Sequence, residues 1–346
     1  MPSGKWISGL SLALSAGMAI AQGTGSPAAM NNGPMELNVV VTAGDRGKPI
    51  AGLPQGNFTV LDNGAPQAIR SFRAVSGSAA PVKVLIVIDA VNVGYDRIAY
   101  ERQEIEKFLR ANDGRLAEPT ALAVFSDTGT QIQPGYSTDG NALSQELDKQ
   151  VIGLRDLRRS AGFYGAEERL DMSLKTLSQL VSRETSEPGR KFILWVSPGW
   201  PLLSGPGVQL SAKSQQGLFG EIVDFSNALR AANTTLYAVD PLGAGEGPGR
   251  TFYYQEFLKG VTKPSQVVPG DLGVQVLAEQ SGGLFLSGNN DIGVLLRQCV
   301  DDASAYYEIS YQPPPSEMPN QYHRIEVRIA DGHLKARTRQ GYYSQP

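Results

Sequence analysis

The sequence has very little of the residue types that most often carry metal or nucleophilic chemistry. Its 346 residues include one cysteine, Cys299, and two histidines, His323 and His333. A single cysteine excludes an intrachain disulfide, although cysteine scarcity fits any compartment. Two histidines in one C-terminal hairpin make a poor metal site. The G-x-S-x-G and G-x-x-x-x-G-K motifs are also missing. These absences argue against a hydrolase or a nucleotide-binding enzyme.

Charge of one sign and long apolar runs are scarce as well. The formal net charge is -3, so no general attraction to nucleic acid or to an anionic membrane is expected. The one long apolar stretch, residues 6–20, follows Lys5 and ends in Ala19-Ile20-Ala21. It predicts a secretory signal peptide over residues 1–21, because it is shorter than the ~20 residues of a spanning helix. A retained membrane anchor is the alternative. The mature chain is expected to be secreted or periplasmic, without a membrane span.

The remaining chain divides into four parts by composition and period. Residues 22–34 are mainly Gly, Ser, Pro, Ala and Asn, which predicts a disordered linker. Residues 35–78 show the alternation of short strands, residues 82–303 alternate apolar strands with amphipathic helices, and residues 304–343 return to strand alternation. Neither terminal block is large enough to bury a core alone. We therefore expect the two to pair into one small antiparallel β domain.

The middle part predicts a doubly wound α/β domain. Its strands and helices alternate at lengths typical of a mainly parallel sheet with helices on both faces. Six strands are expected, and one of them should be an antiparallel edge strand, residues 129–134, because it follows its neighbour too closely for a crossover. In the C-terminal block, Asp331-Gly332 predicts a two-residue β-hairpin. Its basic side chains are expected on a solvated sheet face, with a patch for an acidic partner as the alternative; they are Arg324, Arg328, Lys335, Arg337 and Arg339.

Asp89 is the residue that points most directly to a site. It ends the apolar run 82–88 and precedes a helix expected from Tyr95. An acid at the carboxyl end of a parallel strand, facing a helix start, lies where open α/β sheets hold ions and ligands. A structural role is the alternative, in which the carboxylate accepts backbone N–H groups of the helix start.

This order of elements resembles the von Willebrand factor A (vWA) domain, and the wider plan resembles an acidobacterial VWFA-related family of secreted proteins. The resemblance runs from about residue 35 to the end of the chain. It implies a fold and a secreted location, and no established activity. The matching segments are Lys48-Pro49-Ile50-Ala51-Gly52-Leu53, residues 57–64, Ile88-Asp89-Ala90-Val91-Asn92, Ala99-Tyr100-Glu101-Arg102, Pro188-Gly189-Arg190-Lys191, residues 306–311 and residues 339–343.

The resemblance also implies a metal site made by D-x-S-x-S, a Thr on a second loop and an Asp after the fourth strand. Here Asp89 keeps the first position, but Val91 and Val93 replace the hydroxyls. The second loop, residues 159–164, has no Thr, and Ser197 follows the fourth strand in place of the acid. Only Asp89, Ser160 and Ser197 remain as ligands, too few for Mg²⁺, which needs several fixed oxygens. We expect a degenerate site, with no metal and no cofactor.

Other candidate chemistry is weaker. The glycine-rich segment 243–249 has Pro248 where a dinucleotide loop requires glycine, so a plain loop is expected. His323 and His333 are expected on exposed strand positions. Cys299 shares the apolar face of the last helix and should be a small core residue.

Two long loops at strand ends carry aromatic and apolar side chains suited to an interface. Residues 197–213 include Trp200 and Leu202, and residues 241–270 include Phe252, Tyr253 and Tyr254. The alternative is that these rings cap the core of their own domain.

The sequence as a whole predicts a secreted, non-catalytic module. Its loops near Asp89, together with Asn92 and the aromatic residues, would bind a protein or peptide partner. A metal-dependent adhesion protein with a weak Mg²⁺ or Ca²⁺ site at Asp89, and an uncharacterised hydrolase, are the alternatives.

Overall fold

The computed structural model describes residues 33–44, 47–77, 81–149, 163–203, 210–241 and 253–345. The predicted signal peptide, most of the predicted linker, Ser160 and Phe252 lie outside these ranges. Among the helices that are described, none combines the length and apolar character needed to cross a bilayer.

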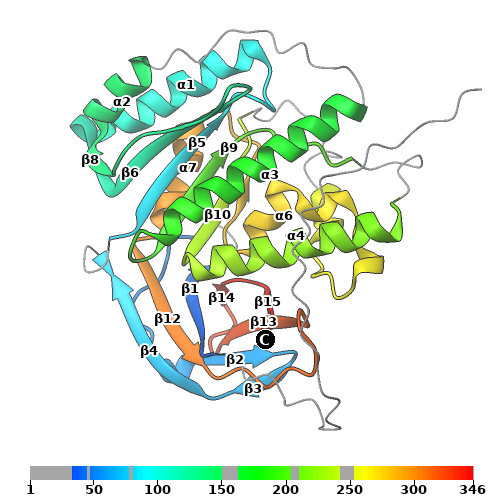
Figure 1. The fold of residues 1–346 in the computed structure, drawn as a ribbon. Coiled ribbons are helices and arrows are strands. Elements are labelled where there is room, and N and C mark those ends of the chain that lie inside the picture. The colour runs from blue at the N-terminus through cyan, green and yellow to red at the C-terminus, as the bar shows by residue number, and fades with distance from the viewer. Residues whose placement is uncertain are drawn as a thin grey trace, which may run out of the picture.

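A mainly parallel sheet forms the centre of the larger part of the molecule (Figure 1). Its strands run in the order β11-β10-β9-β5-β6-β7. The parallel members are β5 (Lys83–Asp89), β6 (Arg115–Ser126), β9 (Lys191–Val196), β10 (Thr234–Val239) and β11 (Phe285–Leu286). β5 lies between β6 and β9, and its residues 84–88 are apolar. Asp89, its last residue, therefore lies at the carboxyl edge of the sheet between these two strands.

The edge beside β6 is antiparallel, as the short connection predicted. The expected strand is β7 (Gly129–Ile132), which pairs with the carboxyl half of β6. A further strand, β8 (Ser137–Asp139), pairs with the amino half of β6. The prediction of six strands was therefore short by one, because the long β6 takes two successive partners along the same edge.

Helices cover both faces of this sheet, since alternate residues of its strands point to opposite sides. Val84, Ile86 and Ile88 of β5 belong to one apolar cluster, whereas Leu85 and Val87 belong to the other. The first cluster is covered by α1 (Tyr95–Arg110), α2 (Gly140–Lys149) and α7 (Ile292–Asp301). The second is covered by α3 (Phe163–Thr185), α4 (Ala212–Ala231) and α6 (Val274–Gln280). Short 3-10 turns occur at η1 (Gln55–Asn57), η3 (Ala111–Gly114), η5 (Tyr253–Phe257), η6 (Pro264–Gln266) and η7 (Pro269–Leu272).

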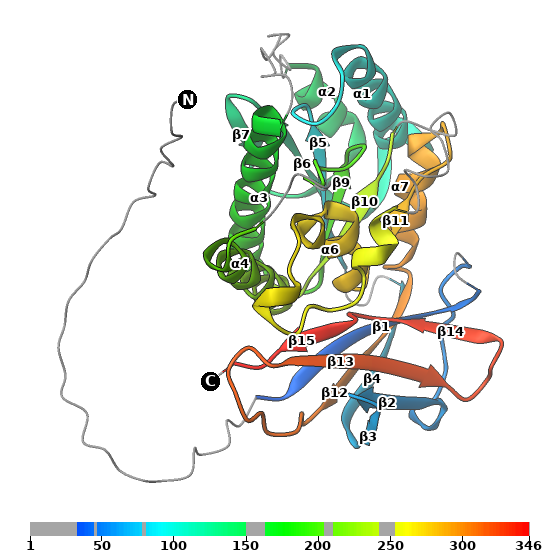
Figure 2. The same ribbon diagram turned by 90° about the vertical axis from the view of Figure 1, so that its right-hand side faces the viewer.

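Two four-stranded antiparallel sheets form a β-sandwich below the α/β part (Figure 2). Their orders are β14-β1-β12-β4 and β15-β13-β2-β3. Segments from both ends of the chain pair directly, β1 with β12 and β2 with β13. The strands are β1 (Met35–Ala43), β2 (Phe58–Asp62), β3 (Ala65–Gln67), β4 (Ile69–Ser76), β12 (Ala305–Tyr311), β13 (Tyr322–Ile329), β14 (Leu334–Arg337) and β15 (Gly341–Tyr343).

The predicted hairpin at Asp331-Gly332 is wrong in its pairing. The turn itself forms, because Asp331 accepts the N–H of His333 at 2.9 Å and that of Leu334 at 3.0 Å. However, β14 leaves β13 and pairs with residues 40–43 of β1, in the other sheet. The turn signal describes four residues only, whereas the choice of partner is set by the free edge of β1. The chain therefore crosses between sheets here, and the two strands diverge.

A buried ionic cluster joins the β part to the α/β part. The Tyr237 hydroxyl donates to the Asp302 carboxylate at 2.7 Å, and the Arg337 guanidinium binds the same oxygen. Arg190 donates to the Asp302 carbonyl at 3.4 Å, and its guanidinium lies 4.3 Å from the Tyr306 ring centre. Arg337 was expected on a solvated face. It is instead half-buried, because β14 turns its side chain toward α7.

Asp302→Ala should lower the free energy of unfolding by about 3 kcal/mol or more, because it leaves the Arg337 charge buried without its partner. The neighbouring Asp301→Ala is the matched control, since Asp301 is exposed. Urea denaturation of both variants measures the difference. Equal losses would show that the cluster does not stabilise the junction between the two parts.

Candidate functional site

The Asp89 carboxylate lies at the carboxyl end of β5 and is completely buried. Its Oδ1 accepts the backbone N–H groups of Val91 and Asn92, both at 2.9 Å. Its Oδ2 accepts the Asn92 side-chain amide at 2.8 Å and the Trp195 indole N–H at 2.9 Å. The predicted role as an acceptor of backbone N–H groups is thus confirmed, but the donors belong to the turn that precedes α1 and not to the start of the helix itself. The Trp195 contact, which comes from β9, was not predicted.

Burial and hydrogen bonding act on this acid in opposite directions. Removal from water raises the pKa of Asp89, whereas the hydrogen bonds from Asn92, Trp195 and Ser197 lower it. The net direction is upward. Ser197, at the end of β9, is itself buried and also accepts the N–H of Gly199 at 3.2 Å.

The residues around Asp89 do not fit a divalent metal ion. Val91 and Val93 are buried and pack into the apolar clusters on the two faces of the sheet. Both Asp89 oxygens already accept two N–H groups each. Within the described ranges, no three His, Cys, Asp or Glu side chains come together as a metal site. A hard ion would have to displace these donors and find its other oxygens elsewhere.

Glu101 is a second buried acid at this edge that the sequence reading did not single out as a site residue. It lies on α1, is completely buried, and neither carboxyl oxygen has a hydrogen-bond partner among the described residues. Burial raises its pKa well above the usual range, and the charges of Asp89 and Asp240 raise it further. Its position between Ile98 and Ile105, on the apolar face of the helix, was the available signal.

Two of the predicted interface aromatics are buried in the core of their own domain. Trp200 is 4% exposed and its ring centre lies 5.0 Å from that of Trp195. Tyr254 is 7% exposed, packs 5.0 Å from Phe285, and donates to Glu279 at 2.6 Å. Their rings cap the apolar cluster, the alternative that the sequence left open.

The other predicted interface residues are less buried. Asn92, Leu202 and Tyr253 are half-buried, and Tyr253 packs 5.4 Å from Phe257. An aromatic that the sequence reading missed stands out more clearly. Tyr164, at the start of α3, is 80% exposed. No periodic pattern marks it, because it lies in the first turn of the helix and at the end of the segment that the sequence predicted to be a loop.

His323 was expected to be exposed, and this prediction is wrong. It is 3% exposed and lies between Asp62 Oδ1 at 2.8 Å and Ser316 Oγ at 3.1 Å. The Tyr311 and Tyr342 hydroxyls donate to the other Asp62 oxygen at 3.0 and 2.9 Å. The register of β13 points His323 into the sandwich, two residues before Ile325, which pairs with Asp62 of β2, and this accounts for the burial. His333 is exposed, as predicted, and Cys299 is a buried core residue, as predicted.

No family model matches the sequence, and no curated protein matches it. Solved structures match with low scores. The human COPII-coat protein Sec24c has a TM-score of 0.35 at 9% identity, over 78% of this chain and 44% of that one. Proximal thread matrix protein 1 from the mussel byssus has 0.36 at 12%, over 70% and 51%. Manganese-loaded Plasmodium vivax TRAP has 0.35 at 10%, over 79% and 97%. This chain spans about half the length of the first two. TM-scores this low establish nothing about ligand or partner.

Glu101→Gln should stabilise the protein at pH 8 and have less effect near pH 4.5. The pKa of Glu101 is higher in the folded state, so folding favours its protonated form, and stability falls as pH rises from the unfolded pKa toward the folded one. Glutamine does not titrate. Thermal unfolding between pH 4.5 and 8 checks this, with the exposed Glu168→Gln as control. A difference in Tm that is independent of pH would contradict a raised pKa of Glu101 in the folded state.

Proposed function

We propose that this chain is a secreted or periplasmic, non-catalytic binding module of the vWA-like class, related in plan to the acidobacterial family that its sequence resembles. It binds a protein or peptide partner at the carboxyl edge of its parallel sheet, without a divalent ion. The support for the class is the order of elements and the mainly parallel sheet with helices on both faces. The position of Asp89 at that edge agrees with it.

The hydrogen bonding of the Asp89 carboxylate is the observation that supports binding without a metal ion. Four N–H donors occupy its two oxygens, and one of them belongs to a buried tryptophan. Removing a buried acceptor from such donors costs about 1–3 kcal/mol for each group left unpaired. A weakly coordinated ion would not recover that cost. Asp89 therefore stabilises the conformation of this edge and does not act as a metal ligand.

Tyr164 provides the exposed anchor for the partner. Asn92 donates to Ser173 of α3 at 2.9 Å, which fixes this helix against the Asp89 turn. Tyr164 lies earlier on the same helix, about 13 Å along its axis. Exposed tyrosines are favourable interface residues, because they bury a large rigid surface and keep a polar end. Leu202, Tyr253 and Asn92 would contribute partly accessible surface beside it.

The buried series of hydrogen bonds from Ser316 through His323 to Asp62 has the residue types of a catalytic triad, and we interpret it as structural. Ser316 is 1% exposed and His323 is 3% exposed, so neither side chain is open to a substrate in this structure. Asp62 also accepts two tyrosine hydroxyls, so its donors come from three strands of the sandwich. Such a fully paired buried network fixes the packing of the strands.

Tyr164→Ala should reduce recovery of the partner from a native envelope extract at least tenfold, as expected for an exposed aromatic hot spot. Met318→Ala is the control, because Met318 is also exposed, at 63%, but lies on the loop before β13. Chelation with EDTA should leave recovery by the unaltered protein unchanged. Recovery that survives Tyr164→Ala, or that EDTA abolishes, would contradict the proposed function.

A further inference from the structure

A cleft opens where β13 and the strand that follows it diverge. β13 pairs with β15 only from Tyr322 to Arg324, and the Ile325 N–H still donates to the Gln340 carbonyl at 2.9 Å. Beyond this point residues 336–340 turn toward the α/β part, where the Gln340 N–H donates to the Gln280 carbonyl at 3.0 Å. The space left between is about 470 Å³. β13 and residues 336–340 form two sides of this cleft, and Tyr254, Glu279 and Phe285 of the α/β part form the third. Figure 2 shows α6 above β13 and β15.

The edge of β13 that faces this cleft has open backbone groups. Alternate residues of a strand direct their N–H and C=O groups to opposite edges. The Arg324 carbonyl and the Ala330 N–H both bond to the β2 side, whereas the Ile325 N–H bonds to Gln340 on the other side. The pairing of residues 325–329 with β2 has no register shift. The N–H and C=O of Val327 therefore point into the cleft, where an extended backbone would pair with them.

The far wall also has an unused polar group. Thr338 lines the cleft, and its Oγ1 is buried without a hydrogen-bond partner among the described residues. Buried polar atoms are normally paired, so this hydroxyl is suited to a ligand that brings its own donor or acceptor.

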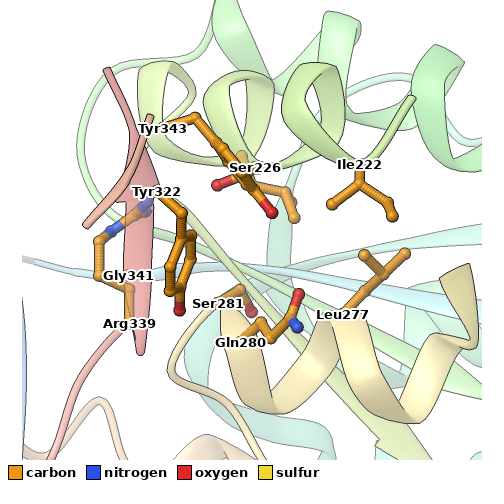
Figure 3. A pocket seen from close by; sticks show the side chains of 10 residues that line it. Ile222, Ser226, Leu277, Gln280, Ser281, Tyr322, Arg339, Gly341 and Tyr343 are labelled. Carbon is orange, nitrogen blue, oxygen red and sulfur yellow. The ribbon is translucent and has the colours of Figure 1, made fainter. Parts of the chain in front are cut away.

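The charges that line the cleft favour an acidic occupant. Glu279 accepts the Tyr254 hydroxyl, Glu326 pairs with Arg328 at 2.6 Å, and Arg337 pairs with Asp302. Arg339 has no hydrogen bond or ion pair from its guanidinium to any described residue. It lines this cleft and a small neighbouring cavity, where Figure 3 shows it beside Tyr322 and Gly341, opposite Gln280 and Ser281.

The surroundings of Arg339 disfavour its positive charge. Burial and the nearby charge of Arg230 lower its pKa to about 10, so it stays protonated at neutral pH. Among the described residues Arg230 has no carboxylate partner either, and its Nε is buried without a hydrogen bond. A carboxylate placed here would relieve both guanidinium groups.

A second cleft of about 720 Å³ continues the first across the outer face of β13. The two share Ile325, Glu326 and Gln340. Lys259 and Arg324 line the continuation, and neither forms an ion pair with a described acid, although Arg324 lies close enough to Glu326 to lower its pKa. A chain segment lying along both clefts would thus meet three unpaired cations, Arg339, Arg324 and Lys259.

We propose that these two adjoining clefts bind an acidic segment of a partner protein in extended conformation. The segment would add a strand to the edge of β13 at Val327, with its carboxylates toward Arg339 and Arg324. The site lies between the α/β part and the β-sandwich, and it is separate from the Asp89 edge. It goes beyond the proposed function, and either can hold without the other.

A fluorescein-labelled hexapeptide of alternating valine and glutamate tests the site by fluorescence anisotropy, against the same peptide with lysine in place of glutamate. The glutamate peptide should bind saturably at submillimolar concentration and at least tenfold more tightly than the lysine peptide. Arg339→Gln should weaken it at least tenfold. Arg70→Gln, which removes an exposed arginine of β4, should leave it unchanged. Val327→Pro, which removes the edge N–H, should also weaken it.

Thermal unfolding of each variant checks that the fold is kept. If Val327→Pro disturbs the sandwich, the result for Arg339→Gln alone tests the site. Absence of saturable binding by the glutamate peptide up to 1 mM would overturn the proposal, since ~1 mM corresponds to about 4 kcal/mol. So would equal binding of both peptides, or a dimer in sedimentation that Arg339→Gln dissociates, because the occupant would then be a second copy. Tyr164→Ala should not change peptide binding, which separates this site from the proposed edge.

Discussion

The hydrogen bonds of the Asp89 carboxylate are the constraint on which the carboxyl edge of the sheet depends. One acid holds the turn before α1 through two backbone N–H groups and holds β9 through the Trp195 indole. Asn92, which donates to the same acid, also donates to Ser173 and so connects α3. Trp195 in turn packs on Trp200 from the following loop. A single buried acceptor therefore positions a turn, two strands, a helix and a loop.

Packed side chains at this edge direct the proposed binding to other surfaces. Buried valines occupy positions 91 and 93 after Asp89, and burial raises the pKa of Glu101 well above its usual range. The Asp89 oxygens are thus occupied by N–H donors, and the proposed partner site at this edge depends on exposed side chains such as Tyr164. The crossing of β14 to the other sheet creates a different kind of surface. It leaves part of the β13 edge without a neighbouring strand, beside three cations that form no ion pair among the described residues.

The sequence predicted those features that repeat locally and missed those that depend on distant partners. Apolar residues at strand and helix spacing gave the parallel sheet, its helices and the antiparallel β7, because burial of one face leaves its period in the sequence. No local pattern shows that Trp195 donates to Asp89, or that His323 meets Asp62 across 261 positions. The Asp331-Gly332 turn was recognised, but the partner of β14 was not, because a turn does not determine which edge is free. Trp200 and Tyr254 were ambiguous for the same reason.

Titration calorimetry with Mg²⁺, Mn²⁺ and Ca²⁺ is the most direct test of the role assigned to Asp89. If its carboxylate is a structural acceptor, none of the three ions should give saturable heat with the unaltered protein up to millimolar concentration. Saturable heat that disappears in Asp89→Asn, with the fold kept, would show that the acid exchanges its N–H donors for a metal ion, and the account of the edge would be wrong.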